Sequence, residues 1–173
     1  MIFPIVKWPD PVLETPGKAI HKFDDELKQL AADMFESMYA ASGIGLAAPQ
    51  IGKSLRIAVI DVTSGKNPEA KIVIANPEIT HIEGEQREDE GCLSLPGFHG
   101  NVLRPKFVTV RAQDATGASF EMHGEGLLAR AFCHEIDHLN GVLFIQHLGM
   151  LKRDMIKRKI RKMIKNGEWQ EAR

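Results

Sequence analysis

The feature that most constrains the fold of this chain is the pentapeptide His134-Glu135-Ile136-Asp137-His138. The preceding stretch, Gly126–Cys133, is rich in good helix formers and lacks proline, and Gly141 lies just past the motif, where helices commonly end. We therefore expect both histidines on one helix. Positions four apart on a helix lie about 40° apart around its axis and roughly 6 Å apart along it, so both imidazoles can hold one metal ion. Glu135 is rotated about 100° from His134, beside the metal, where it can serve as a general base.

The pentapeptide alone leaves a structural alternative open. A helix with two surface histidines and an ion-paired glutamate would have the same sequence and no metal. The rest of the chain has to supply a third ligand and a site for substrate.

The composition is that of an ordinary globular protein. The 173 residues are enough to bury a core, and 43% are hydrophobic and 26% charged. A formal net charge of −1 gives no general attraction to DNA or to a membrane, and no apolar run can span a bilayer. No signal-peptide pattern opens the chain, and two cysteines do not make a disulfide framework. We expect one cytoplasmic domain over residues 1–173, with no DNA or membrane partner.

Hydrophobic periodicity and chain breakers predict the remaining elements. Four prolines in residues 1–23 indicate an extended segment, after which Asp24 caps a helix over 25–41. Strands are expected at Leu55–Val62, at Lys71–Ala75 ended by Asn76-Pro77, at the half-exposed Glu78–Glu85, and in a hairpin of Lys106–Ala112 with Ala118–Met122. The acidic stretch 83–90 is expected to be a solvated connection. This order predicts an α+β fold: small antiparallel or mixed sheets around the central histidine-bearing helix, with an N-terminal and a C-terminal helix.

The segment Gly43–Gly52 combines small and apolar residues without a helical stripe. Small residues let another backbone approach, and a solvent loop would not usually hold so many apolar side chains. We interpret it as a buried stretch that exposes backbone groups at a binding site, with a plain loop as the alternative. It is not a phosphate loop, because the Gly-Lys-Ser/Thr ending is absent and no strand precedes it.

Cys92 is the best candidate for a third metal ligand. One large metalloprotease class continues its motif with a third histidine, but this chain has Phe144 at that place, and His147 comes three residues too late. Cys92 follows a glycine that frees the backbone, and a thiolate is a strong ligand for borderline divalent metals. A buried core thiol is the alternative for Cys92 and our interpretation of Cys133.

Three stretches together resemble the signature motifs of the peptide deformylase family. They are Gly43-x-Gly45-x-Ala47-Ala48-x-Gln50, Glu90-Gly91-Cys92-x-Ser94 and His134-Glu135-x-Asp137-His138, in the family's order and at similar spacing, and Pro9-Asp10-Pro11-x-Leu13 is similar to its N-terminal segment. The resemblance covers nearly the whole chain. It implies a cytoplasmic hydrolase that removes the formyl group from the N-terminal methionine of nascent polypeptides and releases formate.

The resemblance also implies roles for the matching residues. The implied metal ligands are Cys92, His134 and His138, the implied catalytic groups are Glu135, Gln50 and the Leu93 N–H, and the implied substrate contacts are Gly45, Ile44, His99 and Leu127. One divalent metal ion per chain is implied, natively Fe²⁺, with Zn²⁺, Ni²⁺ or Co²⁺ able to occupy the same site. Two histidines and a cysteine leave a fourth position open for water.

The chain departs from the family pattern at two positions. His99 stands where many relatives carry arginine in the substrate cleft, which leaves open the enzyme's preference for peptide residues beyond the first methionine. Cys133 stands where glutamine is common. Three other interpretations remain: a metallopeptidase of the H-E-x-x-H type that cuts internal bonds, a closed structural metal site, and a relative that has lost activity. A fourth protein ligand would favour the closed site.

The C-terminal segment 148–166 is predicted to be a basic amphipathic helix. Its eight basic residues, against the single acid Asp154, are Lys152, Arg153, Lys157, Arg158, Lys159, Arg161, Lys162 and Lys165. Its expected apolar side consists of Leu148, Leu151, Met155, Ile160, Met163 and Ile164. A solvated basic face is the simpler interpretation. The alternative is a docking surface for ribosomal RNA phosphate, near which the implied substrate emerges.

Overall fold

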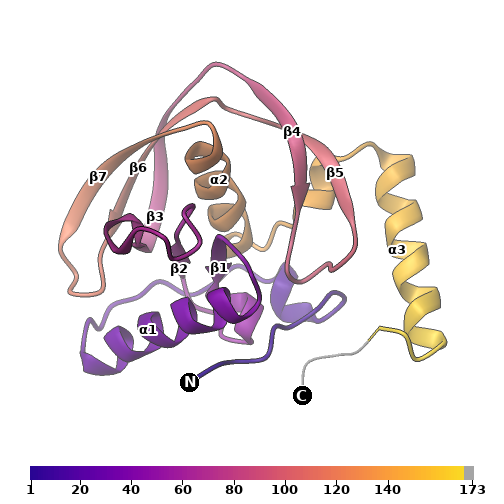
Figure 1. Cartoon of the computed structure of the whole chain (residues 1–173), viewed down its shortest axis with the longest axis horizontal. Helices are drawn as coiled ribbons and strands as arrows, with labels where there is room; N and C mark the ends of the chain where they lie inside the picture. Colours follow the sequence, from indigo (N-terminus) through magenta and orange to yellow (C-terminus); the bar gives the residue numbers. More distant parts are fainter. Residues whose placement is uncertain (170–173) are drawn as a thin grey trace.

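The central element of the computed structural model is the helix α2 (Leu127–Leu139), which carries the pentapeptide (Figure 1). A five-stranded sheet has the order β1-β2-β3-β6-β7 with antiparallel neighbours throughout, and β4 pairs with β5 in a second sheet. The structure describes residues 1–169, so residues 170–173 of the expected domain lie outside it. The other elements are α1 (Asp25–Ala40), β1 (Gly45–Ala47), β2 (Ile57–Ile60), β3 (Ile72–Glu83), β4 (Gln86–Gly91), β5 (His99–Arg104), β6 (Phe107–Gln113), β7 (Ser119–Glu125) and α3 (Met150–Lys165). This is the predicted α+β arrangement.

The five-stranded sheet is covered by a helix on each face near β2. Ile57 and Val59 pack into the cluster that contains α1, whereas Ala58 and Ile60 pack into the cluster that contains α2. Because both faces are covered, β2 is a continuous apolar run and not an alternating one. Burial of each large aliphatic side chain contributes roughly 1.5–3 kcal/mol. The sheet therefore fixes α2 from one side.

The predicted N-terminal helix (α1) and the predicted central helix (α2) are both confirmed, and each begins or ends where the sequence indicated. The Asp24 carboxylate accepts a hydrogen bond from the Leu27 N–H at 3.0 Å, which caps α1. The helix α2 is followed by Gly141 at φ 77°, a backbone conformation that glycine adopts without strain. The predicted hairpin is present as β6 and β7.

The prediction that Asn76-Pro77 ends a strand is wrong. β3 runs through both residues, with a register shift between Ala75 and Glu78 opposite β6. Asn76 has φ 49°, and its side chain accepts from the Ile20 N–H and donates to the Ile20 carbonyl, both at 2.8 Å. A bulge tolerates proline because the bulged residue does not have to donate to the ladder.

The prediction that 83–90 is a solvated connection is right about exposure, since all of residues 83–89 except Gln86 are exposed, but wrong about a connection. Residues 86–91 form β4, which pairs with β5, a strand that the sequence pattern did not predict. Glu90 is only 6% exposed, because Arg104 on β5 neutralises it. An acid in a locally polar stretch gives no sign of such a partner, so sequence periodicity could not place it inside.

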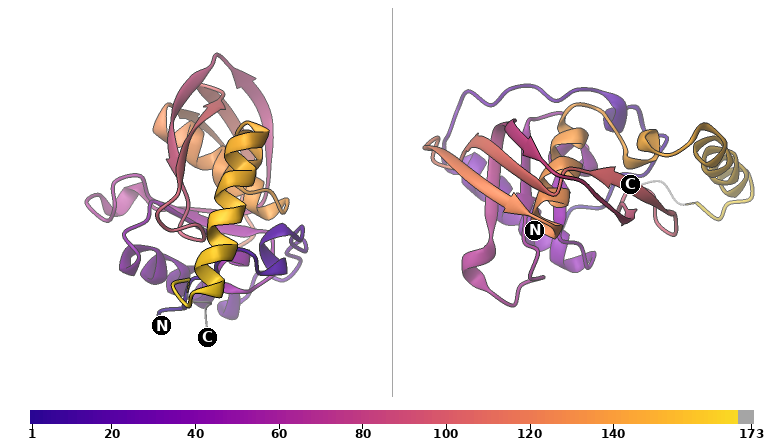
Figure 2. Two further views of the ribbon diagram at one scale, coloured as in Figure 1. Left: turned by 90° about the vertical axis from the view of Figure 1, so that its right-hand side faces the viewer. Right: turned by 90° about the horizontal axis from the view of Figure 1, so that it is seen from above.

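The C-terminal helix α3 lies at the side of the β4–β5 sheet, away from α2 (Figures 1 and 2). Ile156 and Ile160 are buried in a cluster with Trp8 and Val102. The predicted apolar side is wrong at Leu151 and Met155, which are 87% and 51% exposed. Successive residues are rotated by about 100° around a helix, so Leu151 and Met155 point away from the side that Ile156 and Ile160 bury. Among residues 1–169, no helix combines the length and apolar composition needed to cross a membrane.

Candidate active site and metal centre

Cys92, His134 and His138 converge although they come from different elements. The two histidines lie one helical turn apart on α2, and Cys92 directly follows β4. The His138 Nε2 atom lies 3.3 Å from Cys92 Sγ and 3.1 Å from His134 Nε2, and one ligand atom of each residue lies within 4.8 Å of the others. His138 is 1% exposed, so the alternative of two surface histidines is excluded.

This donor set fits a divalent metal ion. A tetrahedral ion with M–N of about 2.05 Å and M–S of about 2.3 Å separates two nitrogens by about 3.4 Å and a nitrogen from a sulfur by about 3.6 Å. The observed separations are only a few tenths of an ångström shorter. Within the part of the chain that the structure describes, no fourth histidine, cysteine or acid joins the group. Within residues 1–169 the group thus has three donors, the number typical of sites that keep a fourth position open for water or substrate.

Glu90 fixes the orientation of His134. Its Oε1 atom lies 2.6 Å from His134 Nδ1, and Arg104 donates to both carboxylate oxygens, at 2.7 and 3.2 Å. Burial alone would raise the pKa of Glu90, but the hydrogen bonds from His134 and Arg104 outweigh it and lower the pKa to about 2. An ionised carboxylate only accepts, so Nδ1 carries a proton, and Nε2 is the ring nitrogen that faces the ligand group.

Glu135 lies beside the ligand group with its carboxyl buried. The residue is 3% exposed, and burial raises its pKa to about 7. Among residues 1–169, its Oε1 atom has no hydrogen-bond partner. A Cβ atom at Gly45 would overlap this carboxyl, so only glycine lets β1 pass so close to α2. The carboxyl is thus held at the cavity with one oxygen available to a proton.

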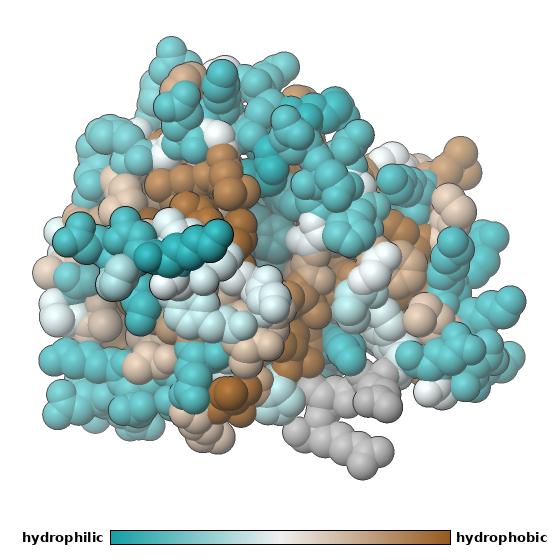
Figure 3. Space-filling view, viewed as in Figure 1, coloured by the Kyte–Doolittle hydropathy of each residue, from teal (hydrophilic) through white to brown (hydrophobic). Residues whose placement is uncertain are grey.

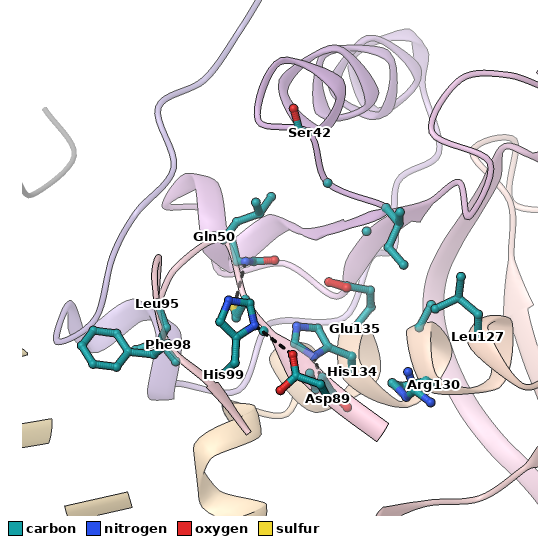
Figure 4. A pocket seen from close by; sticks show the side chains of 18 of the residues that line it. Ser42, Gln50, Asp89, Leu95, Phe98, His99, Leu127, Arg130, His134 and Glu135 are labelled. Carbon is teal, nitrogen blue, oxygen red and sulfur yellow. Dashed lines mark hydrogen bonds and ion pairs between the residues drawn. The ribbon is translucent and has the colours of Figure 1, made fainter. Parts of the chain in front are cut away.

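Gln50 presents its amide nitrogen to the same place. The Ala47 N–H donates to Gln50 Oε1 at 3.0 Å, which assigns the amide orientation. The Nε2 atom then lies 3.5 Å from Cys92 Sγ and 3.2 Å from Ser94 Oγ. A neutral donor is thereby aimed at the space beside Cys92 (Figure 4).

These groups line one cavity of about 380 Å³ (Figure 4). The surface of this face is hollowed near its middle, with hydrophobic side chains beside the hollow (Figure 3). The predicted substrate residues Ile44, Gly45, His99 and Leu127 all line the cavity, as do Gln50, Cys92, Leu93, His134 and Glu135. Every predicted site residue thus lines this cavity except His138, which is buried beside it and completes the ligand group through its contacts with Cys92 and His134.

Four residues of the site were not predicted as site residues from the sequence: Asp89, Glu90, Arg104 and Arg130. Glu90 and Arg104 were missed because their burial depends on each other across two strands. The cavity is also lined by Asp89, whose carboxylate lies 3.2 Å from His99 Nδ1, and by Arg130, which donates to Gln86 Oε1. The only available signal was position: Asp89 and Glu90 directly precede the motif glycine, and Arg130 lies one turn before His134.

A family model for polypeptide deformylase matches residues 2–154. The chain belongs to the polypeptide deformylase family. A peptide deformylase from Acidobacterium capsulatum is 60% identical over 169 residues, which cover 98% of this chain and 99% of that protein. The crystal structure of a peptide deformylase from Legionella pneumophila is 48% identical to this chain, with a TM-score of 0.90, and the match covers 98% of this chain and 99% of that one. The crystal structure of peptide deformylase from Thermus thermophilus is 40% identical, with a TM-score of 0.86, and the match covers 96% of this chain and 98% of that one.

Membership of this family settles the reaction class. Peptide deformylases are metal-dependent hydrolases that remove the formyl group from the N-terminus of polypeptides, and this is the activity of the chain. The metallopeptidase alternative, which cuts internal peptide bonds, is not favoured. The predicted resemblance is therefore confirmed, and the described residues contain a group of one cysteine and two histidines that could hold a metal ion.

Proposed function

We propose that Cys92, His134 and His138 hold one divalent metal ion, natively Fe²⁺, and that the residues around them hydrolyse the formyl amide of formyl-methionyl peptides. The convergence of the three ligand atoms beside buried Glu135, whose Oε1 atom has no hydrogen-bond partner among residues 1–169, carries this proposal. A thiolate with two imidazoles suits borderline metals, so Zn²⁺, Ni²⁺ or Co²⁺ would occupy the same ligands when Fe²⁺ is scarce.

Each polar group of the cavity would have one task in the reaction. When bound, a divalent metal supplies Lewis-acid chemistry, which activates water and polarises a carbonyl oxygen. Glu135 would take a proton from the attacking water and pass it to the leaving amine. Gln50 Nε2–H and the Leu93 N–H would donate hydrogen bonds to the formyl oxygen as it gains negative charge. A neutral amide suits this role, because a carboxylate at position 50 would repel that oxygen.

The proposal is tested by measuring formate release from a formyl-Met peptide with anaerobically purified protein, and metal content on the same sample. We expect one equivalent of metal per chain and turnover that is lost on chelation and restored by Fe²⁺. Turnover by metal-free protein would contradict the proposed ligand set.

We propose that the peptide binds as an extended strand along β1. The strand β1 lies at the edge of the five-stranded sheet, so its outer backbone groups can pair with a peptide, while Ile44 and Leu127 offer apolar contacts to the methionine side chain. His99 and Asp89 would contact residues beyond the methionine. Backbone pairing gives affinity without reading side chains, which suits an enzyme for many nascent sequences.

Strand addition predicts a strong dependence on peptide length. A formyl-Met tripeptide should have a much higher kcat/KM than formyl-Met alone, because only the tripeptide has backbone groups that can pair with β1. The measurement is steady-state kinetics of both substrates in one assay. Equal kcat/KM values would argue against pairing along β1.

We propose that α3 docks on ribosomal RNA, which would place the enzyme in the cytoplasm beside its nascent substrates. Six of its basic side chains are exposed: Lys152, Arg158, Lys159, Arg161, Lys162 and Lys165. Arg161 and Lys157 also lie over the Trp8 ring, at 5.5 and 5.8 Å from its centroid, and so contribute to packing. Salt-dependent attraction to phosphate needs only the exposed set.

Reversing the charge of Arg158, Lys159, Lys162 and Lys165 to glutamate should strongly reduce co-sedimentation with ribosomes at low salt. Activity on a free formyl-peptide should stay unchanged, because residues 150–165 of α3 do not line the cavity. The matched control reverses four exposed lysines elsewhere, namely Lys18, Lys28, Lys66 and Lys106. Equal loss of co-sedimentation in both variants, or no loss in either, would contradict docking through α3, which would then have only a structural role.

A further inference from the structure

Arg104 lies buried between two acids that belong to different elements. It is 5% exposed at the end of β5. Its guanidinium binds both carboxylate oxygens of Glu90 and also donates to Asp137 Oδ2 at 2.7 Å. Asp137 in turn lies 2.8 Å from His147 Nε2, which is 3.3 Å from Arg104 Nη1. One cation thus joins the β4–β5 sheet to α2.

Both bridged acids are close in sequence to metal-ligating positions. Glu90 precedes Cys92 by two residues on the β4 side, and it also contacts His134. Asp137 directly precedes His138 on α2. The proposed thiolate ligand is therefore close in the chain to Glu90, and His138 is adjacent to Asp137 on the helix that also carries His134. A change in the bridge is therefore expected to change the separation between the sulfur and nitrogen ligands.

We infer that Glu90, Arg104 and Asp137 form an ionic clamp that sets the separation of Cys92 from the two histidines, and with it the affinity and size preference for the divalent metal. This inference rests on the ligand set proposed above. The three residues are positioning residues, since they act through the ligands and not on substrate.

The chemistry of the clamp requires arginine. A guanidinium presents several N–H donors in a rigid plane, so it can bind one carboxylate with two bonds and a second carboxylate with a third. A lysine ammonium keeps the charge but is a compact point on a flexible stem, and cannot hold both acids at the same separation. A buried ion network also contributes little net stability compared with apolar packing, which favours a geometric role for this one.

The test is Arg104→Lys, measured as metal affinity and not as activity. Metal-free protein is titrated with Co²⁺ and with Zn²⁺ in competition with a chromophoric chelator, and the Co²⁺ absorption spectrum reports the ligand geometry. Loss of a group that orients metal ligands typically lowers metal affinity about 10–100-fold. We expect a loss of this size, a changed Co²⁺/Zn²⁺ ratio and a shifted Co²⁺ spectrum. The matched control is Arg111→Lys, an exposed arginine 3.5 Å from Glu78 on the large sheet, which should change none of these.

A second variant, Asp137→Asn, keeps the inference testable if Arg104→Lys does not fold. This substitution keeps the shape of the side chain and leaves the ion pair between Arg104 and Glu90 intact. A smaller change in metal affinity and in the Co²⁺ spectrum, in the same direction, is therefore expected. Unchanged affinities and spectra in both folded variants would overturn the clamp. If wild-type protein itself failed to bind one equivalent of metal, the proposed ligand set would fail instead, so the two failures are distinguishable.

Discussion

Replacing Glu135 with glutamine should lower kcat for deformylation by about 10²–10⁴-fold, the usual contribution of a general acid–base group. The amide has nearly the shape of the carboxyl but cannot take a proton from water. Fold and metal content should be retained, because Glu135 lies beside the ligand group and is not one of its members. Formate release, metal analysis and thermal unfolding of the same sample check the three expectations.

The matched control for this prediction is Glu125→Gln on β7, which removes an exposed carboxylate that does not line the cavity. It should leave kcat unchanged. A near wild-type rate for Glu135→Gln would show that another group moves the proton, and would remove the proposed role of Glu135.

Replacing Cys92 with alanine should abolish stoichiometric metal binding and, with it, deformylation. The two imidazoles would remain, but two ligands one helical turn apart hold a divalent ion far less tightly than three. Cys92→Ser should retain some metal with altered selectivity, since a hard oxygen replaces a soft thiolate. Metal analysis after dialysis and the sulfur-to-metal charge-transfer band of the Co²⁺ protein measure both effects.

Cys133→Ala provides the control, because it removes the other thiol while leaving the ligand group intact. Cys133 is buried in the cluster between α2 and the large sheet, and burial raises the pKa of its thiol to about 11. We expect a modest loss of stability and an unchanged metal stoichiometry. Full metal content in Cys92→Ala would instead place Cys92 outside the ligand set.

Much of the site could be predicted because its motifs are local. The spacing of His134 and His138 fixes their common face wherever the helix packs, and Asp24 caps its helix with its own side chain. The small residues of the first motif predicted that another backbone comes close, whereas at Gly45 the close neighbour is the side-chain carboxyl of Glu135. The roles assigned to these residues in catalysis remain predictions that the experiments above test.

By itself, the sequence determined the three α-helices, the strands β2, β6 and β7, and which residue types could bind a metal, because periodicity and capping act within a few residues. Only the tertiary structure decided that an acidic stretch becomes β4, since the burial of Glu90 depends on Arg104 fourteen positions away. The same holds for Asn76-Pro77, where contacts with Ile20 stabilise a bulge, and for α3, where the buried stripe depends on what the helix packs against. A charged or polar side chain is placed inside by its partner, and the identity of that partner is known only once the chain has folded.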